Sequence, residues 1–151
     1  MSEQVPDSIT GRVEQTEGEF AGWTYWKGDP FEDRAGPFFE KQFDDGTCVV
    51  AFRAEPRHMN GGGFMHGGCL MTFADGALFS IARGEIEGHH SVTLHLTGDF
   101  LAQVKVGQLV EARGEVVRGG GKTIFVAGVV TADGTPALRF DGIIRKLAKR
   151  D

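Results

Sequence analysis

Residues 60–82 read NGGGFMHGGCLMTFADGALFSIA, a glycine-rich loop that runs directly into an apolar segment. Apolar residues cover most of the helical circumference over residues 68–83, which is typical of a buried helix rather than a surface helix. We expect this helix to stop at Gly84, because glycine is common just beyond helix C-termini. The stretch predicts one long central helix, entered through a loop whose backbone other groups can approach closely.

Segments rich in β-forming residues lie on both sides of the predicted helix. Before it, FFEKQF and TCVVAFRA flank Asp44-Asp45-Gly46, and an Asp-Gly pair between two such runs indicates a hairpin. After it, four runs cover residues 90–101, 108–117, 122–131 and about 135–147, with a second hairpin at Asp133-Gly134. Six strands and one buried helix predict an α+β fold, in which a curved antiparallel sheet wraps around the helix.

Composition bounds the class of protein. The chain has 151 residues, 40% of them hydrophobic, and a net charge of −5, so one domain that does not bind nucleic acid is expected. No run of about 18 apolar residues and no signal peptide is present in this sequence, and the two cysteines lack metal or disulfide spacing. We therefore expect a cytoplasmic protein without membrane contact. Residues 1–20 read as a mobile polar arm. The aromatic patch that follows reads as an anchor on the core rather than a ligand box; its residues are Phe20, Trp23, Tyr25, Trp26 and Phe31.

Asp75 is the most unusual residue of the predicted helix, because a charge in an apolar helix is costly unless it is paired or hydrated. No cation lies one helical turn away to pair with it. Two interpretations stay open from the helix alone. Asp75 either reaches solvent or a local hydrogen bond, or it is a catalytic carboxylate.

The loop before the helix is a candidate site for a polarised carbonyl. Asn60, His66, Gly67 and Gly68 precede or begin the helix, where free amides and the helix dipole favour negative charge. Gly68 and Asp75 are seven residues apart, which places them ~10 Å from each other along one helix. If both act on one carbonyl, two antiparallel helices must share the site, so the protein should be at least a dimer.

Other candidate sites are weaker. RGGGKT at residues 118–123 lacks the first glycine of a nucleotide-binding loop and runs into a strand, so a nucleotide triphosphatase is rejected. The turn is either a contact for a ligand phosphate or a plain exposed turn; its residues are Arg118, Gly119, Gly120, Gly121 and Lys122. His89, His90 and His95 lack partner ligands, so no metal is expected. Cys69 reads as a small buried residue rather than a nucleophile.

The run over residues 60–82 resembles the Asn-x5-His-Gly-Gly…Ala-Asp segment of hotdog-fold acyl-CoA thioesterases, in the PaaI-like and 4-hydroxybenzoyl-CoA thioesterase group. The resemblance covers about residues 31–147 and includes GPFFEKQFDDGTCVV and SVTLHLTGDFLAQVKVGQLVEARGEVVRGGGKTIFVAGVV. It implies a hotdog fold over residues 31–151, after a partly flexible leader over residues 1–30. It also implies a homodimer that pairs into a tetramer, and an acyl-CoA substrate with no separate cofactor.

The resemblance also implies roles for individual residues. Asp75 would be the nucleophile or general base, and the Gly68 amide would polarise the thioester carbonyl. Asn60 and His66 would position the thioester or the water from the partner chain, and Thr93 would help to position that water. Gly67 and the turn over residues 118–122 would contact the coenzyme A part. A hotdog-fold enoyl-CoA hydratase or dehydratase, with His66 and Asp75 as the acid–base pair, and a non-catalytic acyl-CoA binder are the alternatives.

Overall fold

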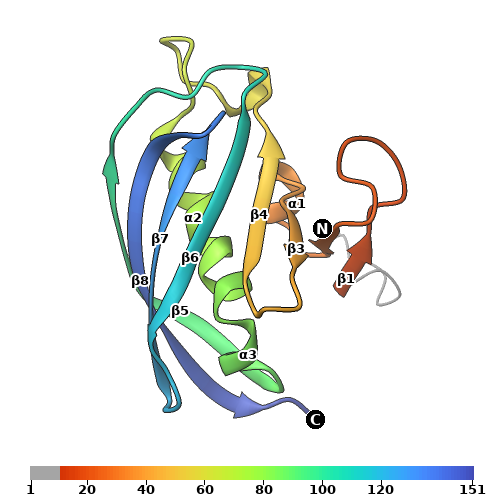
Figure 1. The fold of residues 1–151 in the computed structure, drawn as a ribbon, viewed down its shortest axis with the longest axis vertical. Coiled ribbons are helices and arrows are strands. Elements are labelled where there is room, and N and C mark those ends of the chain that lie inside the picture. The colour runs from red at the N-terminus through yellow and green to blue at the C-terminus, as the bar shows by residue number, and fades with distance from the viewer. Residues whose placement is uncertain (1–10) are drawn as a thin grey trace, which may run out of the picture.

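The protein's structure, a computed structural model, describes residues 11–151 and contains one antiparallel sheet of eight strands (Figure 1). The strands are hydrogen-bonded in the order β1-β2-β3-β4-β6-β7-β8-β5. Their bounds are β1 Gly11–Glu14, β2 Thr24–Lys27, β3 Phe39–Gln42, β4 Cys48–Arg53, β5 His89–Phe100, β6 Leu109–Arg118, β7 Thr123–Ala132 and β8 Thr135–Lys149. The predicted α+β class and the curved sheet are confirmed.

Helix α2, Gly67–Ile81, lies in the concave side of the sheet and buries five of its residues there: Leu70, Phe73, Ala74, Ala77 and Leu78. The predicted central helix is confirmed, but its predicted end is wrong. The chain breaks at the buried Ala82, which has φ −88° and ψ 9°, and a short helix α3, Arg83–Ile86, follows. Gly84 has helical backbone inside α3, whereas Gly88 takes the left-handed conformation at φ +75° just after it.

Both predicted hairpins are present. Gly46, at φ +86°, turns the chain between β3 and β4, whose residues pair from Phe39 with Ala51 to Gln42 with Cys48. Asp133 and Gly134 have φ values of +47° and +84°, the pair of left-handed residues that a tight hairpin with the twist of a sheet needs. These turns fix the registers of the two halves of the sheet.

The N-terminal part of the described chain is ordered, so the mobile arm predicted for residues 1–20 is wrong over residues 11–20. Strand β1 pairs with β2, and Phe20 is 7% exposed and stacks on Phe39 at a centroid distance of 4.4 Å. Tyr25 also meets the Phe39 ring edge-on, so the predicted anchoring by aromatic residues is confirmed for these two. Residues 1–10 lie outside the described range. The boundary at residue 30 stays a prediction, and β1 and β2 extend the sheet on the N-terminal side of it.

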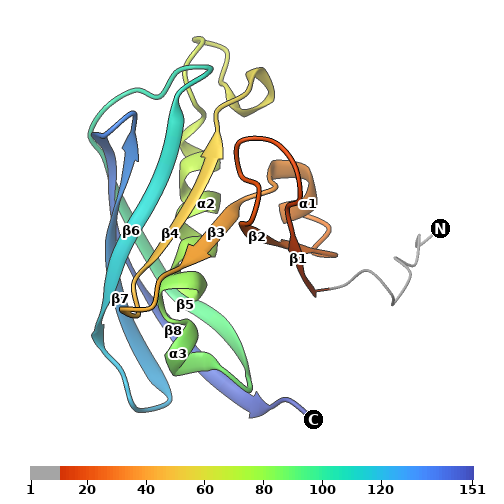
Figure 2. The same ribbon diagram turned by 45° about the vertical axis from the view of Figure 1, so that its right-hand side comes forward.

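Helix α1, Glu32–Ala35, connects this N-terminal part to the core and is held at its C-terminal end. The side chains that hold α1 come from a short 3₁₀ helix, Pro56–His58, in the loop after β4. His58 donates from Nε2 to the carbonyl of Ala35 at 2.8 Å, and Arg57 donates to the carbonyls of Arg34 and Gly36. Figure 2 shows the result: β1, β2 and α1 lie on the opposite side of α2 from strands β6, β7 and β8. Helix α2 is therefore covered on two sides.

Candidate active site

Asp75 lies at the middle of α2 and is half-buried. Its carboxylate accepts a hydrogen bond of 2.6 Å from Oγ1 of Thr93, which comes from β5. Within residues 11–151 no lysine or arginine forms an ion pair with Asp75. One hydroxyl uses only part of the capacity of a carboxylate to accept hydrogen bonds, so Asp75 can also hold a water or a ligand donor. The structure thus brings together two of the predicted site residues.

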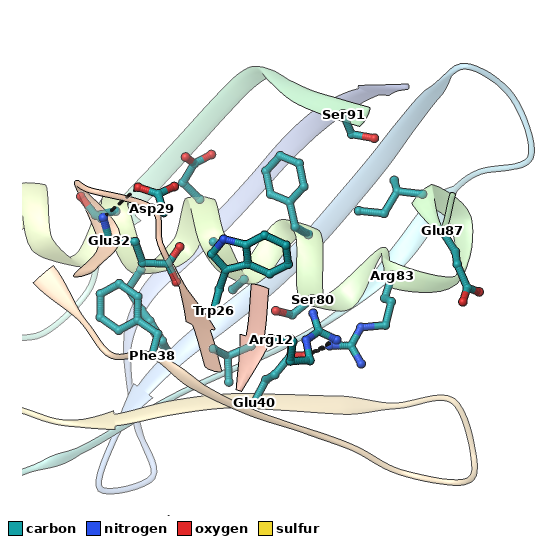
Figure 3. A pocket seen from close by; sticks show the side chains of 18 of the residues that line it. Arg12, Trp26, Asp29, Glu32, Phe38, Glu40, Ser80, Arg83, Glu87 and Ser91 are labelled. Atoms are coloured by element: carbon teal, nitrogen blue, oxygen red, sulfur yellow. Dashed lines mark hydrogen bonds and ion pairs between the residues drawn. The ribbon is translucent and has the colours of Figure 1, made fainter. Parts of the chain in front are cut away.

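A cavity of about 730 Å³ opens beside Asp75 and runs along α2 toward α3 (Figure 3). One wall comes from α2 and α3, and another from β3, β4 and the start of β5. The N-terminal part of the chain closes the remaining side with a set of polar and aromatic residues: Arg12, Trp26, Asp29, Phe31 and Glu32. None of these five was singled out as a site residue from the sequence, where Trp26 and Phe31 were assigned to core anchoring. The clue available was the alternation of β2, which places Trp26 on the face opposite Tyr25.

The N-terminal end of α2 does not reach this cavity in a single chain. His66 is the N-cap of α2, and its Nδ1 accepts a hydrogen bond of 2.9 Å from the Gly68 amide. A side chain at Gly67 would come within 3.1 Å of the Phe100 ring, so this glycine lets Phe100 approach the helix start. The Gly67 amide has no hydrogen-bond partner in the part of the chain that the structure describes.

Asn60 belongs to the same loop but turns toward its own backbone. Its Oδ1 accepts hydrogen bonds from the amides of Gly62 at 2.8 Å and Phe64 at 3.4 Å. Neither Asn60 nor His66 lines the cavity at Asp75. One chain therefore holds the predicted carboxylate and the predicted loop residues in separate places, as the helix geometry indicates.

The glycine turn over residues 118–122 lies near α3, at the far end of α2 from His66 (Figure 1). The Gly120 amide donates a hydrogen bond of 2.7 Å to Oε2 of Glu85. The same carboxylate fills the space above Gly119, where a side chain would come within 2.5 Å of it. Glu85 thus takes up the Gly120 amide and the space above Gly119 in this chain.

Glu32 is a cavity residue that the sequence analysis did not select. It begins α1, where its amide donates a hydrogen bond of 3.1 Å to Asp29, and its side chain points toward Trp26 and Phe38 (Figure 3). Burial, followed by the charges of Asp29, Asp33 and Asp75, raises the pKa of Glu32 to about 7. A carboxyl group that can carry a proton at neutral pH therefore lies in the same cavity as Asp75.

The other end of the cavity is charged. Glu40 of β3 is buried, at 5% exposure, and accepts from Arg12 at 3.0 Å and from Arg83 of α3. We call these three residues the Arg12–Glu40–Arg83 cluster. Its two guanidinium groups and one carboxylate leave one net positive charge, and the burial of Glu40 requires at least one of these partners.

The remaining candidates from the sequence are a metal site and the Cys69 thiol. The described residues contain no group of three or more His, Cys, Asp or Glu that could hold a metal ion. Burial raises the pKa of the Cys69 thiol to about 11, so Cys69 stays protonated and is a poor nucleophile. No helix in residues 11–151 has the length and apolar character needed to cross a membrane.

Comparisons with known proteins identify the fold and the family. The thioesterase superfamily model matches residues 62–137, half of the chain. PA0474 of Pseudomonas aeruginosa, which is named provisionally as an esterase, is 34% identical to this chain over 103 residues. The aligned residues cover 68% of this chain and 77% of PA0474.

Two solved structures are also similar. A variant of the phenylacetic acid degradation protein PaaI from Thermus thermophilus is 30% identical with a TM-score of 0.65, over 79% of this chain and 100% of that one. A hypothetical thioesterase from Streptococcus pneumoniae, solved with coenzyme A, is 23% identical with a TM-score of 0.67, over 76% and 88%. The predicted hotdog fold is confirmed.

Proposed function

The chain belongs to the thioesterase superfamily as a PaaI-like hotdog protein, and we propose on that premise that it hydrolyses acyl-CoA thioesters at the cavity beside Asp75. The observation that carries this proposal is a half-buried carboxylate that is unpaired among the described residues, held by the Thr93 hydroxyl at the mouth of a cavity of about 730 Å³. The S. pneumoniae structure, which holds coenzyme A, supports the substrate class. The reaction consumes one water and gives the free acid and coenzyme A with its thiol restored.

In this proposal Asp75 acts on the thioester carbonyl, either by attacking it or by taking a proton from the attacking water. A thioester carbonyl is electrophilic and its thiolate leaves readily, so a positioned carboxylate and backbone donors can suffice. Thr93 fixes the carboxylate through its 2.6 Å hydrogen bond and leaves the other lone pairs of Asp75 for water. Glu32, with its pKa near 7, is available in the same cavity to hold a proton.

The donors that polarise the carbonyl would come from the α2 terminus of a second copy. Asp75 and the helix start are ~10 Å apart along one helix, too far to share one carbonyl. Strand β5 is an edge of the sheet and exposes Val92 and Leu94 at 42% and 56%, so it offers a second copy both backbone groups and apolar area. Of the two predicted glycine amides, that of Gly67 is free among the described residues, and that of Gly68 would have to leave His66 to serve as the donor.

The hydration of an enoyl-CoA is the second candidate, and the His66 geometry disfavours His66 as the base of that reaction. Because Nδ1 accepts from the Gly68 amide, a neutral His66 carries its proton on Nε2 and has no free lone pair to act as a base. Release of free thiol from acyl-CoA, set against loss of the double bond of an enoyl-CoA, separates the two reactions. Tight binding of CoA esters with neither reaction would instead support the non-catalytic binder.

The test of the proposal is a hydrolysis screen over short, long and aryl acyl-CoA esters, with thiol detection. We expect turnover of at least one class, and no release of thiol from any ester would contradict the proposal. A mixture of Asp75→Ala and Asn60→Ala chains tests the shared site. Partial recovery of activity is expected only where one active site combines both chains. The tetramer, the cytoplasmic location and the contact of coenzyme A with Arg118 and Lys122 stay predictions.

A further inference from the structure

The pairing of β1, β2 and β3 places three cavity residues on one face of the N-terminal sheet. Arg12 lies directly opposite Trp26, and Thr24 lies opposite Glu40. Residues opposite each other in antiparallel strands project to the same side, and alternate residues along a strand do the same. Arg12, Trp26 and Glu40 therefore share one face of these strands, and because all three line the cavity along α2, this face is turned toward α2.

Trp26, together with Phe31, differs from the other aromatic residues of this part of the chain, because these two line the cavity. Phe20, Trp23 and Tyr25 pack against one another or against Phe39, and they hold the segment on the core. Trp26 has no aromatic partner among residues 11–151, is 36% exposed and lines the cavity. In Figure 3 its indole lies between the Glu32 and Phe38 end of the cavity and the Arg12–Glu40–Arg83 end. An aromatic side chain in this position contacts the cavity rather than the core.

The Arg12–Glu40–Arg83 cluster lines the cavity at a distance from Asp75, and residues of α3 and β5 also line it. Arg83 lies eight residues after Asp75, which corresponds to roughly 12 Å at the rise of a helix. An apolar chain that starts at Asp75 can pack against Trp26, Phe38 and Phe79 over this distance. Farther along, the chain meets the charges around the buried Glu40, and packing methylene groups against them removes hydration without replacing it.

We propose that Trp26 is a specificity-determining residue of the thioesterase, and that its indole and the Arg12–Glu40–Arg83 cluster limit the substrate to apolar acyl groups shorter than a lauroyl chain. This inference rests on the proposed function, because it assigns the cavity to the acyl part of the acyl-CoA substrate. The indole forms part of the side wall of the cavity, and the ion cluster places charges farther along it.

The matched variants Trp26→Ala and Trp23→Ala test the wall in the full-length protein. Each removes one indole from the same segment, but only Trp26 lines the cavity. We expect the wild type to prefer octanoyl-CoA to lauroyl-CoA in kcat/KM. Trp26→Ala should raise the lauroyl-to-octanoyl ratio about tenfold or more, which is the scale on which hydrophobic pockets discriminate chain length. An unchanged ratio in Trp26→Ala, or an equal change in Trp23→Ala, overturns the proposal.

A binding measurement tests whether the acyl group lies beside Trp26, even if no acyl-CoA is hydrolysed. The chain has two tryptophans, so Trp23→Phe leaves Trp26 as the only one, and Trp26→Phe leaves Trp23. The probe is a ketone analogue of octanoyl-CoA, in which a methylene replaces the thioester sulfur, compared with coenzyme A alone. The analogue should change the fluorescence of the Trp23→Phe protein and not that of Trp26→Phe, and coenzyme A alone should change neither. A Trp26 that does not respond contradicts the acyl pocket, whereas a response without hydrolysis contradicts only the proposed function.

Discussion

Two parts of the chain build the cavity beside Asp75, and they supply different things. Residues 62–137, which match the thioesterase superfamily, provide the carboxylate, its Thr93 partner and most of the glycine loop. Residues 11–40, which lie outside that match, provide Trp26, Glu32 and most of the Arg12–Glu40–Arg83 cluster. The first part contains the groups proposed for the chemistry, and the second contains the walls that would select the acyl group. Substitutions in the first should therefore lower the rate, and those in the second should change selectivity and pH dependence.

The largest effect is expected at Asp75. Asp75→Asn keeps the shape and the hydrogen bond to Thr93 but removes the charge, so kcat should fall about a thousandfold, within the range for loss of a catalytic base. Asp99→Asn is the matched control, because Asp99 is exposed and pairs with Arg139 on the surface. Initial rates of thiol release at equal concentrations of folded protein measure both. A rate within about tenfold of wild type would place the chemistry elsewhere.

A smaller loss is expected at Thr93, which acts through Asp75. A hydrogen bond to a charged group contributes about 1.5–3 kcal/mol, so Thr93→Ala should lower kcat roughly 10- to 100-fold. Thr93→Ser retains the hydroxyl and should recover most of the rate. Thr97→Ala, on the same strand but exposed, should have no effect. If Thr93→Ala and Thr97→Ala behaved alike, the 2.6 Å contact would have no catalytic role.

The prediction for Glu32 concerns how the stability of the protein changes with pH, rather than its rate of hydrolysis. Burial raises its pKa from 4.5 to about 7, so between these values the folded protein binds a proton that the unfolded chain releases. The stability contributed by this proton is present below the lower value and is lost as the pH rises through 7. Glu32→Gln removes the titration, so the Tm of the wild type should fall relative to that of Glu32→Gln between about pH 5 and pH 8. Glu17→Gln, exposed in the same segment, is the control, and parallel Tm curves for wild type and Glu32→Gln would refute the shift.

The smallest effect is expected at the turn over residues 118–122, which belongs to the matched segment but not to the cavity. The Glu85 carboxylate accepts a hydrogen bond of 2.7 Å from the Gly120 amide, and its negative charge repels a phosphate there. Glu85→Gln should therefore lower KM for CoA esters about two- to fivefold, the scale of one partly screened charge, without changing kcat. Glu115→Gln on the exposed part of β6 serves as the control. An unchanged KM would show that the CoA phosphates bind away from this turn.

The sequence predicted the matched segment better than the N-terminal part, for physical reasons. Helix α2 and the strands after it follow from periodicity and turn residues, and the helical spacing of Gly68 and Asp75 already separated the two predicted groups. The end of α2 was misplaced because Ala82, not a glycine, breaks the helix. Trp26 was missed because its role depends on the pairing of β1, β2 and β3, and Glu32 because its place depends on how Arg57 and His58 hold α1; local patterns encode neither. The contact between Glu85 and Gly120 was missed for the same reason, since it joins residues 35 positions apart.

A crystal structure with the methylene ketone analogue of octanoyl-CoA tests most directly whether both parts of the chain form one active site. The ketone carbon should lie beside the Asp75 carboxylate, either about 3–3.5 Å from one of its oxygens or separated from it by one water. Its acyl chain should pack along Trp26 and end before the Arg12–Glu40–Arg83 cluster. An acyl chain outside the cavity, with its carbonyl remote from Asp75, would contradict both the proposed chemistry and the role of the N-terminal part.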